Sequence, residues 1–98
     1  MTSIEEFRAE AHKLVDWIAD YYRNTAAYPV KSQVAPGEIA SRLPMVPPEN
    51  AESFPSVFAD FENIIMPGIT HWQNPGFFAY FPANSSFPSL LGEMLTSA

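Results

Sequence analysis

The sequence predicts a mainly α-helical chain, and two observations carry this prediction. Apolar residues recur at helical spacing in two separate stretches, residues 4–23 and 55–65. The order of elements is helix, proline-rich arm, helix, aromatic segment and helix start, which lacks the alternating strands and helices of a complete α/β domain. The 98 residues suffice for one small domain with a modest core.

Residues 4–23 are predicted to form an amphipathic helix. Ser3 and Glu6 have the spacing of a capping box, in which each side chain accepts a hydrogen bond from the backbone N–H of the other residue. Trp17 lies on the flank of the apolar stripe. Two interpretations stay open: the stripe packs in a core, or it lies against another subunit. The stripe consists of Ile4, Phe7, Ala11, Leu14, Val15, Ile18, Tyr21 and Tyr22.

Residues 24–52 are predicted to form an extended arm, because five prolines interrupt any regular pattern. Within the arm, residues 36–43 (PGEIASRL) are predicted to form a short helix with Pro36 in its first turn. Ile39 and Leu43 are the apolar pair that we expect to dock this helix.

A second helix is predicted from about Pro55 to Ile65, with Pro67 and Gly68 ending it. The segment GFFAYFP at 76–82 has five consecutive apolar residues, which predicts an extended chain buried on both faces. A last helix is predicted to begin at Ser86 or Phe87. Its stripe of Leu90, Leu91, Met94 and Leu95 has no stop signal, so we expect the chain to be truncated.

The composition limits the possible functions. Hydrophobic residues make up 47% and charged residues 16% of the chain, against about 25% charged in a typical domain, so some apolar surface is expected to face a partner. The net charge is −6 with scattered basic residues, which disfavours nucleic acid as a partner. No cysteine is present, which excludes disulfides and thiol catalysis. With no signal peptide and no membrane-spanning stretch visible, we expect a cytoplasmic protein and no membrane contact.

Residue types alone assign no catalytic residue. His12 and His71 have no carboxylate cluster at ligand spacing, which excludes a metal site. Lys13 and Lys31 have no evident desolvated pocket, which a Schiff-base lysine needs. The four glycines are too far apart to cradle a phosphate.

Residues 64–95, IIMPGITHWQNPGFFAYFPANSSFPSLLGEML, carry three consecutive motifs. These are M-P-G-x-T-H-W, then N-P-x-F-F-A-Y-F-P, then S-S-x-P. Together they resemble the hallmark segment of the group II pyridoxal-phosphate-dependent decarboxylases, the family of the aromatic L-amino acid and DOPA decarboxylases. EEFRAEAHKLVDWIADYY resembles the opening helix of that family, and YPVKSQVAPGEIASRLP resembles its proline-rich arm. The resemblance covers the whole chain, but only the first part of a longer family protein.

This resemblance implies a fold and an activity. The chain would be the amino-terminal helical arm of a fold-type I enzyme, which is α/β when complete. Residues 1–84 would form a dimerisation arm with its proline-rich linker and aromatic segment, and residues 85–98 the truncated start of the large cofactor-binding domain. The enzyme would convert an aromatic L-amino acid to its amine and CO2, and residues downstream of Ala98 would bind pyridoxal 5'-phosphate. A homodimer partner would bind through the first helix. The alternative is a stand-alone helical dimerisation module without catalysis.

The resemblance also implies a substrate site. The family lines its pocket with the Trp and Y-F-P positions, and no catalytic, cofactor-binding or metal-binding residue is implied within residues 1–98. Animal DOPA decarboxylases have threonine after Y-F-P, where this chain has alanine. Any polar contact to the substrate at this place must then come from Asn84, from the backbone or from water. Phenylalanine-like, tyrosine-like and indole substrates all fit such a wall, histidine stays open, and glutamate is disfavoured. The implied substrate-binding residues are Trp72, Tyr80, Phe81, Pro82 and Ala83.

Overall fold

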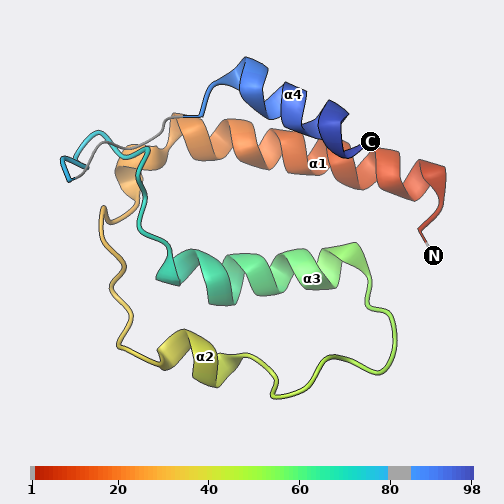
Figure 1. Ribbon diagram of the computed structural model, residues 1–98, viewed down its shortest axis with the longest axis horizontal. Coiled ribbons are helices and arrows are strands. Elements are labelled where there is room, and N and C mark those ends of the chain that lie inside the picture. The colour runs from red at the N-terminus through yellow and green to blue at the C-terminus, as the bar shows by residue number, and fades with distance from the viewer. Residues whose placement is uncertain (1, 80–84) are drawn as a thin grey trace.

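The computed structural model describes residues 2–79 and 85–98, and within these ranges the chain is helical without any strand, as predicted. The longest helix, α1 (Ile4–Arg23), runs along the molecule, with α4 (Phe87–Ser97) on one side and α3 (Phe54–Asp60) on the other (Figure 1). The short helix α2 (Glu38–Arg42) lies beyond α3. The molecule measures 42 × 36 × 22 Å, so it is flat.

Helix α1 has the predicted bounds and the predicted capping box. Glu6 N donates to Ser3 Oγ at 3.1 Å, and Ser3 N donates to the Glu6 carboxylate at 2.7 Å. The indole of Trp17, on the flank of the stripe, makes the contact to the second helical segment. Its ring meets those of Phe58 and Phe61 edge to face, at centroid distances of 5.5 and 5.6 Å.

The second helical segment covers the predicted range but changes its winding. Helix α3 passes into a single π-helical turn, η2 (Phe61–Ile65), and then into the 3-10 turn η3 (Met66–Gly68). Met66 N donates to Phe61 O, five residues back, which widens the turn. Pro67 has no N–H with which to continue the ladder, so the helix tightens and ends at Gly68.

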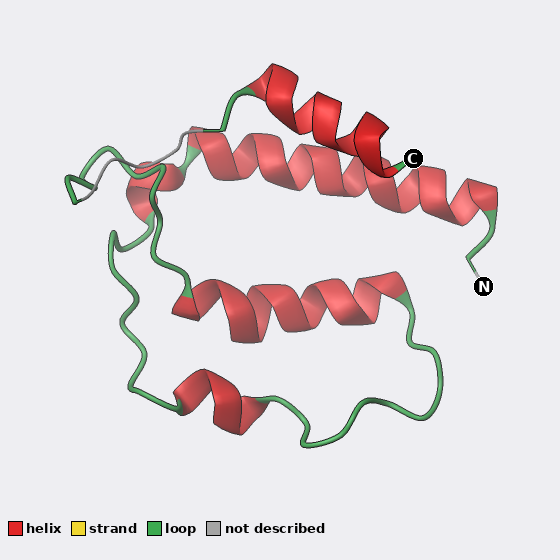
Figure 2. Cartoon of the chain, viewed as in Figure 1, coloured by secondary structure: helices red, strands yellow, loops and turns green. Residues whose placement is uncertain are grey.

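The arm carries α2 between two long loops (Figure 2). The prediction that Pro36 lies in its first turn is wrong: Gly37 is the N-cap, with a left-handed φ of 81°, and Pro36 precedes it. A glycine accepts this conformation without the steric cost of a Cβ. Ile39 docks α2 against η3, since its Cγ1 lies 2.9 Å from the place where a Cβ on Gly68 would sit. Leu43 stays exposed.

Helix α4 begins as predicted. Ser86 caps it through reciprocal hydrogen bonds with Ser89, and Pro88 occupies the first turn. The prediction that the aromatic segment is buried on both faces is wrong for its described part, because Phe78 is 90% exposed. A run of apolar residues cannot by itself tell which neighbours cover it.

The described residues enclose a very small core. Met66 is their one buried hydrophobic residue, and three polar residues are buried beside it: Thr25, His71 and Asn74. Large apolar side chains of α1 and α4 remain exposed, among them Ile4 at 77% and Leu95 at 80%. The excess of apolar surface that the composition predicted is therefore confirmed. No helix in the described ranges combines the length and the apolar character needed to cross a membrane.

Candidate functional site

One of the five predicted site residues can be located. Trp72 lies four residues after the end of η3 and is 44% exposed. Its ring stacks on that of Phe77, with centroids 5.3 Å apart and planes 20° from parallel. We call Trp72 and Phe77 the aromatic pair. The other four predicted residues lie outside the described residues: Tyr80, Phe81, Pro82 and Ala83.

Two consecutive turns bring the aromatic pair together. Asn74 N donates to His71 O at 3.0 Å, and Phe77 N donates to Asn74 O at the same distance. The side-chain oxygen of Asn74 accepts from Gly76 N at 2.8 Å, which fixes the second turn. The side-chain rings at 72 and 77 therefore meet because the backbone folds back at Asn74.

The turns are fastened to the start of the arm through His71 and Asn74, which we call the clasp. Asn74 Nδ2 donates to Thr25 O and to Tyr28 O, both at 2.9 Å. His71 N donates to Val30 O at 3.0 Å, and its ring Nδ1 lies 2.7 Å from the hydroxyl of Tyr21. His71 is 3% exposed and Asn74 7%; the bond to Thr25 is buried, and those to Tyr21 and Tyr28 are partly buried.

Sequence reasoning missed the clasp. It used His71 only to exclude a metal site and did not consider Asn74. No clear signal of their burial was present in the sequence, because Thr70 and Gln73 beside them are also polar; once buried, a polar side chain is nearly always hydrogen-bonded. The sequence offered no means of finding their partners, because three of the four are backbone carbonyls.

Burial also sets the protonation of the clasp. Desolvation lowers the pKa of His71 from its ordinary value, which favours the neutral imidazole. Desolvation raises the pKa of the Tyr21 hydroxyl, and the neighbouring Tyr22 and Tyr28 raise it further. The 2.7 Å contact therefore joins two neutral groups. With the ring proton on Nε2, the Tyr21 hydroxyl donates to Nδ1.

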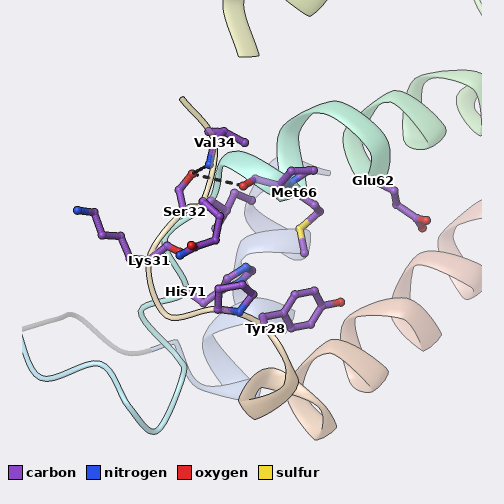
Figure 3. Close-up of a pocket in the computed structure, with 11 residues that line it drawn as sticks. Tyr28, Lys31, Ser32, Val34, Glu62, Met66 and His71 are labelled. Carbon is purple, nitrogen blue, oxygen red and sulfur yellow. Dashed lines mark hydrogen bonds between the residues drawn. The ribbon is translucent and has the colours of Figure 1, made fainter. Parts of the chain in front are cut away.

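A hollow of about 380 Å³ lies beside the clasp (Figure 3). Tyr28, Met66 and His71 line its inner side, and Glu62 of η2 stands at its edge. Figure 3 shows the Lys31 side chain extending away from the hollow. Trp72 does not line it, so the structure keeps the hollow and the aromatic pair apart.

Neither of the two lysines is placed to form an imine with pyridoxal phosphate. Lys13 is exposed and pairs with Glu10 at 3.0 Å, and Lys31 is exposed in the arm, so neither has the desolvated surroundings of an imine-forming lysine. Residues 2–79 and 85–98 contain no group of three side chains able to hold a metal.

Comparison with known proteins gives matches along nearly the whole chain. The family model described as the pyridoxal-dependent decarboxylase conserved domain matches residues 36–98. A tyrosine decarboxylase of Papaver somniferum is 50% identical over 93 residues, which are 95% of this chain and 18% of that protein. A tryptophan decarboxylase of Camptotheca acuminata is 55% identical over 91 residues, which are 93% of this chain and 18% of that protein.

Solved structures agree with these matches. Catharanthus roseus tryptophan decarboxylase in complex with L-tryptophan is 45% identical, with a TM-score of 0.87 over 97% of this chain and 20% of that one. Rhodiola rosea 4-hydroxyphenylacetaldehyde synthase is 42% identical, with a TM-score of 0.88 over the same shares. The chain thus spans about a fifth of the length of these relatives and matches their amino-terminal region.

Proposed function

This chain belongs to the pyridoxal-dependent decarboxylase family, and from that premise we propose that it is the amino-terminal part of an enzyme that converts an aromatic L-amino acid to its amine and CO2. The observation that carries this proposal is the aromatic pair, a flat and partly exposed surface held by a buried clasp. Aromatic rings that stack on such a surface gain about 0.5–1.5 kcal/mol beyond the burial of their area.

In this proposal the chain supplies part of the substrate pocket. Trp72 forms one portion of the wall, and Tyr80, Phe81, Pro82 and Ala83 continue it, as the family resemblance implies. Ala83 has no polar side-chain atom, so a hydroxyl on the substrate ring must find its partner elsewhere. Tyrosine and tryptophan are the leading substrates, because decarboxylases of both kinds are among the relatives.

We assign pyridoxal 5'-phosphate to residues downstream of Ala98, as the family resemblance implies, because Lys13 and Lys31 are both exposed. We propose the cytoplasm as the location of the enzyme.

The exposed side of α1 is proposed to bind the same face of a second subunit. Ile4 and Phe7, 77% and 66% exposed, present two large apolar side chains next to each other on one helical turn. Exposed apolar clusters of this kind mark contact surfaces. In the full-length protein, Phe7→Glu should convert a dimer into monomers in light scattering, whereas Glu5→Gln, on the polar side of the same helix, should leave the dimer intact. A Phe7→Glu variant that stays dimeric would place the interface elsewhere.

The catalytic proposal is tested on the full-length protein with added cofactor. We expect it to release amine and CO2 from L-tyrosine, L-DOPA or L-tryptophan, and not from L-glutamate. The product must be measured as amine and as aldehyde separately, because the related Rhodiola protein is an aldehyde synthase. A protein that releases neither product would leave the stand-alone dimerisation module as the better interpretation.

A single variant then tests the wall. Trp72→Ala should raise KM for the preferred aromatic substrate about tenfold through loss of ring contact. Trp72→Phe, which keeps a ring, should retain most of the affinity. An unchanged KM in Trp72→Ala would remove Trp72 from the pocket.

A further inference from the structure

We infer that His71 and Asn74 are positioning residues, which set the affinity of the enzyme for its aromatic substrate by holding the aromatic pair in place. The inference rests on the proposed function. Neither residue is required to touch the substrate. Both act through Trp72, which lies between them in the chain.

The turn at residues 71–77 is fastened to one continuous segment of the chain, residues 21–30. Four hydrogen bonds leave His71 and Asn74 for other parts of the chain, and all four end between Tyr21 and Val30. Those partners lie on the last turn of α1 and on the first residues of the arm. The orientation of the turn is therefore set by the end of α1, about 50 residues earlier in the chain.

The turn at residues 71–77 also fixes how the two rings of the aromatic pair lie against each other. The backbone of Asn74 takes part in both turns, as donor to His71 O and as acceptor from Phe77 N. Trp72 lies within the first turn, and Phe77 closes the second. A rotation at Asn74 would separate the two rings, whose centroids are 5.3 Å apart. An aromatic ligand gains its stacking energy only when the rings of the wall keep their orientation, so loss of the clasp should weaken substrate binding.

One substitution at Asn74 isolates the positioning role of its side chain. Asn74→Asp keeps the size and the acceptor toward Gly76 N, but it removes both Nδ2 donors. It also sets a carboxylate against the carbonyls of Thr25 and Tyr28, where buried groups need a donor. Tyr21→Phe is the milder variant, because it removes only the hydroxyl that meets His71. Asn63→Asp is the matched control, since Asn63 is exposed on η2.

The experiment uses the full-length enzyme with its cofactor. For Asn74→Asp we expect KM for the aromatic substrate to rise about tenfold, while kcat stays within twofold of the wild-type value. Tyr21→Phe should raise KM about threefold, and Asn63→Asp should leave both constants unchanged. Hydrogen exchange should become faster at the amides of residues 71–77 in Asn74→Asp, and not in Asn63→Asp.

A double-mutant cycle separates positioning from a general loss of stability. In the Trp72→Ala background, Asn74→Asp should raise KM by no more than about twofold, because the ring that it positions is gone. Additive effects on KM, or an unchanged KM in both Asn74→Asp and Tyr21→Phe, would overturn the positioning role. A wild-type protein that releases no product from any aromatic amino acid would instead overturn the proposed function on which that role rests.

Discussion

Replacement of Trp17 by alanine tests how α1 holds the second helical segment. The indole lies between the two, and two of its ring contacts cross from α1, to Phe58 and to Phe61. A third contact, to Tyr21, stays within α1 and does not join the helices. Loss of the indole should therefore loosen α3 and leave α1 helical.

The size of the effect follows from these contacts. Two interhelical aromatic pairs contribute about 1–3 kcal/mol beyond area burial. The indole is only half-buried, so the apolar area that it hides adds about 2 kcal/mol at roughly 25 cal/mol per Å². Because the chain relaxes in part, we expect the opening free energy of α3 to fall by about 3 kcal/mol, at the lower end of measured Trp→Ala effects. Trp17→Phe keeps a ring and should cost about 1 kcal/mol.

Hydrogen exchange in the full-length protein measures this change locally. The amides of α3 and η2 should exchange about 150-fold faster in Trp17→Ala, which is 3 kcal/mol expressed as a ratio. Arg8→Ala on the same helix removes an exposed ion pair with Glu5, and it should alter exchange in α3 by less than threefold. Equal exchange in α3 for Trp17→Ala and the wild type would refute this account of the packing.

Two further predictions concern stability. Burial lowers the pKa of His71, so the unfolded chain binds the proton at a higher pH than the folded chain does. The free energy of unfolding should therefore be fully retained above about pH 6.5. It should fall as the pH drops from there toward the lower pKa of the folded state. Urea midpoints at pH 7.5 and 5.5 should show this loss, which His71→Gln should reduce; an equal loss in His71→Gln and the wild type would contradict the role of His71. Gly68→Ala would set a Cβ 2.9 Å from Ile39 Cγ1 and should destabilise the protein by about 1–3 kcal/mol. Urea midpoints should show that the double variant Gly68→Ala with Ile39→Ala loses less stability than the sum of the two single variants. If the two losses add fully, the strain lies elsewhere.

The helices that the sequence predicted well are those defined by local signals. The capping box at Ser3 and Glu6 fixed the start of α1, and Ser86 with Pro88 fixed the start of α4. The π-helical turn at Phe61–Ile65 was not predicted, because its residues have the same apolar spacing as an ordinary helix. The burial of the aromatic segment was predicted wrongly for its described part, where Phe78 is exposed, because a run of apolar residues does not show which neighbours cover it.

The candidate site also combines residues that the sequence predicted with contacts that only the structure shows. Trp72 was predicted as a site residue from the family resemblance, and its place in the pocket stays a prediction; its stacking on Phe77 appeared only in the structure. Tyr80, Phe81, Pro82 and Ala83 lie outside the described residues, and their place in the pocket stays a prediction.

By itself, the sequence determined where the longer helices lie, where α1 and α4 begin, and to which family the chain is similar. Each of these depends on residue types within a few positions of one another or on a long continuous motif. The tertiary structure alone decided that Asn74 binds the carbonyls of Thr25 and Tyr28, which lie 49 and 46 residues away. Every residue carries a backbone carbonyl, so no pattern of side chains marks the ones that become partners. They are selected only when the end of α1 and the turn after η3 come together and exclude water between them.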